Sequence, residues 1–113
     1  MAFDEVLTSR TRAALAAAGH PGAAEKKMFG GMAFLIGGNM CCGVRGDDLL
    51  VRVGPEAGPS ALAESAARPF EMGQRGPSAG FILVGPDGTA TDEALATWVG
   101  RALAFVVTLP AKS

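Results

Sequence analysis

The sequence has few of the residues from which most catalytic and metal sites are built. His20 is the only histidine, so the chain cannot supply the histidine cluster of a typical zinc site. It has no Walker A loop, and no glycine-rich dinucleotide-binding fingerprint follows a candidate strand. We therefore expect no metal ion, no cofactor and no catalytic constellation, which makes an enzyme the less favoured class of function.

Long apolar runs and an excess of one charge are also missing. No stretch of about 18 apolar residues offers a membrane-spanning helix, and no segment resembles a signal peptide. The formal net charge of -1 gives no general attraction to nucleic acid or to an anionic membrane surface. With 113 residues, the chain is predicted to form a single domain, residues 1–113, located in the cytoplasm.

The two cysteines, Cys41 and Cys42, are adjacent in a chain without an export signal. Neighbouring residues of a strand point to opposite faces, so a disulfide between the two would be strained. We interpret both as small buried apolar residues in a reducing cytoplasm. The alternative is a thiol-dependent or small-ligand site that uses Cys41 or Cys42 as a thiolate, or redox or thiophilic-metal chemistry at the same place.

What the sequence does contain is an antiparallel meander over residues 31–53. Three short apolar runs are separated by two turn signals, Gly37–Asn39 and Gly46–Asp48. Glycine and asparagine favour such turns because they tolerate positive φ. Side chains alternate between the two faces of a strand, so Met40 and Cys42 are predicted to share one face, opposite Cys41.

Helices are predicted before and after this meander in the sequence. Apolar residues at three- and four-residue spacing predict an N-terminal helix over residues 3–18 and a C-terminal helix over residues 92–108. A short helix is predicted from Pro55 to about Ala67, and the apolar run before Gly85 predicts one more strand, residues 80–84. The fold class is therefore α+β, a two-layer domain with an antiparallel sheet of about four to five strands.

Two strands of the meander carry apolar residues on both faces. One face is predicted to be covered by the helices and the other only partly covered. An uncovered apolar sheet face would be a large exposed patch, so a second copy of the chain is a candidate to cover it. We therefore expect a homodimer.

Basic residues are the candidates for binding an anion or an anionic partner. Lys26 and Lys27 precede glycines whose backbone N–H groups could form an anion-binding nest. The alternative is that they are solvated at a sheet edge, where lysine discourages aggregation. The further candidates are the arginines Arg45, Arg52, Arg68 and Arg75.

Four segments together resemble the N-terminal domain of the TfoX/Sxy family. They are Lys26–Phe34 (KKMFGGMAF), Gly38–Met40, Asp48–Val53 and Trp98–Leu103. The resemblance extends from about Phe3 to Pro110, and the stretch KKMFGG is its most specific part.

The resemblance implies a regulatory role. The family takes its name from regulators of natural competence, which act on transcription in the bacterial cytoplasm together with a cyclic-AMP receptor protein. Those regulators carry a second, C-terminal helical domain, and this sequence is expected to hold the first domain alone. The resemblance implies no catalytic residues, and it supports the α+β fold predicted from the residues.

The favoured hypothesis is accordingly a small cytoplasmic regulatory or protein-interaction domain, with a protein of the transcription machinery as a candidate partner. The first alternative is the small-ligand binder or thiol-dependent enzyme. The second is direct binding of nucleic acid, for which all six basic candidates would have to converge on one face. The balanced charge argues against it, because affinity for nucleic acid comes largely from neutralising phosphates.

Overall fold

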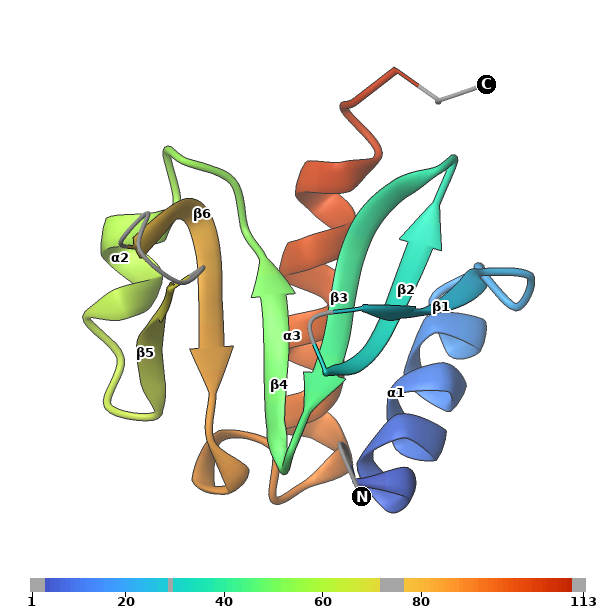
Figure 1. Ribbon diagram of the computed structural model, residues 1–113, viewed down its shortest axis with the longest axis horizontal. Helices are drawn as coiled ribbons and strands as arrows, with labels where there is room; N and C mark the ends of the chain where they lie inside the picture. Colours follow the sequence, from blue (N-terminus) through green and yellow to red (C-terminus); the bar gives the residue numbers. More distant parts are fainter. Residues whose placement is uncertain (1–3, 29, 72–76, 111–113) are drawn as a thin grey trace.

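A computed structural model describes residues 4–28, 30–71 and 77–110 of the chain (Figure 1). An N-terminal helix, α1 (Glu5–Ala17), packs beside a C-terminal helix, α3 (Asp92–Val106). Both helices contact the strands of one antiparallel sheet, and α3 passes behind the sheet in Figure 1. This confirms the two-layer α+β fold.

Over the described residues the sheet has six strands, one or two more than predicted. Its spatial order is β1-β2-β3-β4-β6-β5, and every neighbouring pair is antiparallel. The strands are β1 (Ala24–Met28), β2 (Gly31–Ile36), β3 (Asn39–Arg45), β4 (Asp48–Arg52), β5 (Ala67–Glu71) and β6 (Pro77–Val84). The predicted meander is β2 to β4, and β1 and β5 lie at the two edges of the sheet.

Side-chain caps fix the starts of the two long helices. The Asp4 carboxylate accepts hydrogen bonds from the backbone N–H groups of Val6 and Leu7, at 2.8 and 3.0 Å. Thr91 Oγ1 accepts from the Ala94 N–H group at 3.1 Å. Both helices are slightly shorter than predicted, although residue 3 lies outside the described residues. None of the helices in the described ranges has the length and apolarity to cross a bilayer.

The connection from β4 to β5 is less helical than predicted. Instead of a helix from residue 55 to 67, it holds only the short helix α2 (Gly58–Leu62). Ala57 precedes this helix and offers no side-chain cap, and proline occupies its first turn. A short 3₁₀ turn, η2 (Pro86–Gly88), connects β6 to the segment before α3.

The main core lies between the sheet and the helices. Its largest fully buried side chains include Phe34, Leu49 and Val51 from the sheet and Leu95 and Val99 from α3. The side of α1 that faces this core holds two threonines, which the predicted apolar stripe did not include. Thr11 Oγ1 donates to the Leu7 carbonyl at 2.8 Å, so its buried hydroxyl is satisfied within the helix.

A β-bulge in β3 overturns the predicted alternation around the cysteines. Phe34 pairs with Cys42, but the next residue, Leu35, pairs with Met40, so Cys41 is the extra residue. Both cysteines consequently belong to the main core. Met40, predicted to share a face with Cys42, packs in a separate cluster on the other side of the sheet.

Two ion pairs attach α1 to its neighbours. The Arg12 guanidinium holds the Glu25 carboxylate of β1 through two hydrogen bonds, at 2.6 and 2.7 Å. Arg10 Nη2 lies 3.2 Å from the Asp92 carboxylate at the start of α3. The hydrogen bond from Arg12 lowers the pKa of the Glu25 carboxyl group below its ordinary value.

Candidate partner-binding face

The side of the sheet away from the main core, which we call the open face, carries a second and smaller apolar cluster. Leu50, Phe70 and Leu83 are buried there, and Met40 and Phe81 pack against them. No residue of a described helix belongs to this cluster, because its members all come from β3, β4, β5 and β6. The cluster is therefore the floor of a surface that the protein's own helices leave uncovered.

The pairing register places basic residues at both ends of this face. One continuous row crosses all six strands, since residues directly opposite in an antiparallel ladder point to the same side. The row consists of Lys26, Ala33, Gly43, Leu50, Leu83 and Arg68. Its centre is apolar or small and its two ends are cationic. Because β1 is an edge strand, Lys26 lies at the border of this face.

Two arginines cover the apolar floor between these ends. The Arg45 guanidinium lies 5.8 Å from the Phe70 ring centroid, and that of Arg52 lies 5.2 Å from the Phe81 centroid. Arg52 also donates to the Met40 carbonyl at 3.3 Å. Long cationic side chains that lie on aromatic rings bury their stems and keep their charge at the surface.

The described arginines on the helix side of the sheet are paired with carboxylates, whereas two of the three described arginines on the open face are not. Arg10, Arg12 and Arg101 each form an ion pair with a carboxylate. Among the described basic residues of the open face, only Arg68 is paired, with Asp48 at 2.6 Å. Within the described ranges, Lys26, Arg45 and Arg52 take part in no ion pair. The open face thus presents uncompensated positive charge, although the whole chain is nearly neutral.

The structure brings together four of the six basic residues singled out in the sequence. Lys26, Arg45, Arg52 and Arg68 share the open face. Lys27 pairs with Met32 and so points to the opposite side of β1, and Arg75 lies outside the described residues. The anion-binding nest beside the two lysines stays a prediction.

Sequence reasoning missed the aromatic partners of these arginines. Phe70 and Phe81 come from β5 and β6, and their ring centroids are 6.2 Å apart. The signals in the sequence were that Phe70 alternates with Met72, as in an edge strand, and that Phe81 begins the apolar run of residues 81–84. The pairing of those segments beside β4 depends on long-range topology, which the sequence pattern does not specify.

The two cysteines are poorly suited to nucleophilic chemistry. Both are fully buried, with 0% of their surface exposed, and both are free thiols. A hydrogen bond with Cys41 and burial raise the pKa of the Cys42 thiol well above its ordinary value. A thiol held protonated in the core is a weak nucleophile, which disfavours Cys42 as a catalytic thiolate. No group of three or more potential ligand side chains in the described part of the chain could hold a metal ion.

Most of the chain is similar to a known protein family. A family model described as the TfoX N-terminal domain matches residues 13–106. The matched range begins within α1, includes every strand and ends at the last residue of α3. No curated protein and no solved structure matches.

Proposed function

Because the chain belongs to the TfoX N-terminal domain family, we propose that it is a small regulatory module that binds another protein through its open face. The observation that carries the proposal is the uncompensated positive charge of Lys26, Arg45 and Arg52 around an apolar floor. The complementary ligand is a polypeptide segment that combines carboxylates with apolar side chains. A link to transcription rests on the resemblance to competence regulators.

A cytoplasmic site of action is part of the same proposal. The support for it is that both cysteines are free thiols in the core. A reducing compartment keeps such thiols unoxidised. Mass spectrometry of the protein isolated from its native host under alkylating conditions should find both cysteines reduced, and an oxidised pair would contradict the assignment.

An acidic partner fits the open face better than a second copy of the chain does. A two-fold axis through the centre of this face would place the basic residues of one protomer against those of the other. Like charges brought together across an interface cost energy and disfavour that pairing. The homodimer expected from the sequence therefore stays a prediction, to be tested by native mass spectrometry with and without Arg45→Glu.

A protein partner also fits better than single-stranded nucleic acid. Binding of single strands relies on exposed aromatic rings on which successive bases stack. Phe70 is only 4% exposed, and Arg52 already lies against the half-buried Phe81. The face thus offers cations, but few free rings.

The test is a titration of the labelled protein, followed by ¹H–¹⁵N NMR at low salt. The probes are a short peptide of alternating glutamate and leucine, the same peptide with lysine for glutamate, and an oligothymidylate. The acidic peptide should shift resonances of β3, β4 and β6, and Arg45→Glu should weaken it about tenfold. Tighter binding of the lysine peptide or the oligonucleotide, or no binding of the acidic peptide, contradicts the proposal.

The chain offers a matched control for the position of the charge. Lys26 and Lys27 are adjacent, both exposed, and on opposite sides of β1. Lys26→Glu should lower the affinity for the acidic peptide by more than Lys27→Glu does. Equal effects would mean that the peptide responds to net charge and not to the open face.

A further inference from the structure

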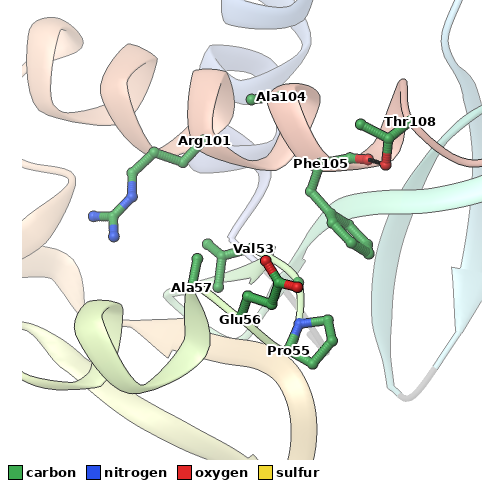
Figure 2. Close-up of a pocket in the computed structure, with 9 residues that line it drawn as sticks. Val53, Pro55, Glu56, Ala57, Arg101, Ala104, Phe105 and Thr108 are labelled. Carbon is green, nitrogen blue, oxygen red and sulfur yellow. Dashed lines mark hydrogen bonds between the residues drawn. The ribbon is translucent and has the colours of Figure 1, made fainter.

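A cleft lies where the chain leaves the sheet after β4, between α3 and the segment that follows this strand (Figure 2). Its volume is about 570 Å³, within the range of small-molecule sites. Its walls are mainly apolar and come from Val53, Pro55, Ala57, Ala104 and Phe105. The cleft shares none of its lining residues with the open face.

The backbone beneath Phe105 is built so that this ring can lie against it. Gly54 has a φ of 91°, and a Cβ atom there would lie 2.4 Å from Phe105 Cδ1. Gly80, with a φ of 83°, accepts hydrogen bonds from the N–H groups of Val53 and Gly54. A Cβ atom on Gly80 would lie 2.7 Å from the Gly54 carbonyl carbon. Only glycine fits both positions without displacing its neighbours. This wall of the cleft therefore depends on the close approach of the Gly54 backbone to the Phe105 ring and to Gly80.

The polar groups offered at the cleft are hydrogen-bond acceptors. The Glu56 carboxylate points into the space between α3 and the loop in Figure 2, and no ion pair is found for it among the described residues. Thr108 Oγ1 donates its proton to the Phe105 carbonyl at 2.6 Å, which leaves the hydroxyl oxygen as an acceptor. The C-terminal end of α3 adds the negative end of a helix dipole.

The two arginines near the cleft contact groups that lie outside it. Arg101 lines the far end of the cleft, where it forms an ion pair with Glu64. Its guanidinium carbon lies 4.4 Å from the centroid of the Trp98 ring. In Figure 2 its guanidinium points away from Phe105. Arg52 lies 5.4 Å from the Phe105 ring centroid, but it binds the Met40 carbonyl and does not line the cleft. Among the described residues that line the cleft, the charge left without an ion pair is therefore that of Glu56.

We propose that this cleft binds a small molecule that joins a protonated amine to an apolar body of about one ring. The apolar body packs on Phe105, Ala104 and Pro55. The ammonium group donates to the Glu56 carboxylate. This assignment is independent of the proposed function, because it uses neither the open face nor a protein partner.

The test compares three probes of one shape by ¹H–¹⁵N NMR titration of the full chain. They are phenethylamine, phenethyl alcohol and hydrocinnamate, which end in an ammonium, a hydroxyl and a carboxylate group. Phenethylamine should shift the resonances of Glu56, Ala104 and Phe105 with a dissociation constant on the order of 1 mM, as expected for so small a ligand. Hydrocinnamate should bind most weakly.

Variants at exposed positions separate the charge from the cavity. Glu56→Gln should lower the affinity for phenethylamine about fivefold and leave the affinity for phenethyl alcohol unchanged. Ala104→Trp should fill the cleft and abolish binding of both. Ala96→Trp, at an exposed position of the same helix that does not line the cleft, should change neither.

Three outcomes overturn the proposal. The first is no binding of phenethylamine, the second is hydrocinnamate binding at least as tightly as the amine, and the third is a Glu56→Gln variant that binds the amine normally. Because both cleft variants are at exposed residues, thermal unfolding should show that each retains the fold, and the result then speaks to the cleft alone.

Discussion

Both faces of the sheet carry buried apolar side chains, but these side chains are covered by different means. On the face toward the helices, side chains of α1 and α3 interlock with those of the strands in one large core. On the open face, a few apolar residues are covered by Met40, Phe81 and the stems of Arg45 and Arg52. The first arrangement removes the sheet from water permanently. The second leaves a surface covered by side chains alone, with no described helix packed over it.

This difference suggests how a small domain separates stability from recognition. The helix-covered core supplies the packing that a chain of this size needs to fold. The open face can then vary its charge at a smaller cost in stability than a change in the main core, because the large losses come from cavities and unsatisfied groups in packed cores. The comparison can be tested at several matched positions.

The sharpest comparison is between Leu49 and Leu50. These neighbours in β4 are both 0% exposed, but Leu49 belongs to the main core and Leu50 to the cluster on the open face. Leu49→Ala should lower the free energy of unfolding by about 4 kcal/mol, and Leu50→Ala by about 2 kcal/mol. Arginine stems can relax into the smaller cavity, whereas helices cannot.

Urea unfolding of both variants measures these losses. Equal losses would mean that the open face is packed as rigidly as the main core. In that case the distinction between the two faces would be wrong.

A smaller effect is expected where the chain leaves the sheet for the cleft. Gly54→Ala should lower the free energy of unfolding by about 3 kcal/mol, because the new Cβ atom meets the Phe105 ring while the residue keeps a positive φ. Gly46 also has a positive φ, of 60°, but a Cβ atom added there would meet no atom within 4 Å. Gly46→Ala should therefore cost only the backbone strain, about 1 kcal/mol. Thermal unfolding of the two variants checks the difference.

The arginines of the open face should contribute less to the free energy of unfolding than Gly54 does. Arg52 lies near two rings and donates to a carbonyl, so Arg52→Ala should lower the free energy of unfolding by about 1 kcal/mol. Arg45 has one ring contact, and Arg45→Ala should cost about half as much. Denaturant unfolding in parallel provides the measurement. A larger loss for Arg45 would show that its cover over Phe70 is structural.

The smallest effect concerns the ion pair on the helix side. The folded-state pKa of Glu25 is lowered by Arg12, so the pair stabilises the protein above the pKa of the unfolded glutamate. That contribution is lost as the pH falls through the folded-state pKa. Both side chains are partly exposed, which keeps the effect small.

Glu25→Gln should flatten the decline of stability on acidification, measured by urea unfolding across the acid range. Asp87→Asn, at an exposed turn, serves as the control. An unchanged slope in the Glu25 variant would mean that the pair adds nothing in solution.

The sequence predicted the elements whose signals are local. The turns around Gly37 and Gly46 defined the meander, and the apolar stripe defined the last helix. Strand β1 was missed because its residues are exposed on both faces and give no alternation. The bulge at Cys41 was missed because an inserted residue leaves no mark in a run of apolar side chains.

The candidate site was predictable only as a set of residue types. The basic residues could be named, but their convergence depends on which strands pair. Arg52 meets Phe81 because β6 lies beside β4, and it approaches Phe105 where α3 ends near the sheet. The cleft has the same origin, since Gly54 and Phe105 are brought together only by the tertiary fold.

The strand order also constrains how the chain can fold during synthesis. Strand β6 is inserted between β4 and β5, so the backbone groups of β4 on that side have no partner until residues 81–84 have been synthesised. A growing chain that ends after β5 therefore exposes an apolar sheet edge, the kind of edge that pairs with other chains. We expect β5 and β6 to join the sheet together as a hairpin, so that the amides of β4 and β6 become protected from hydrogen exchange in the same step.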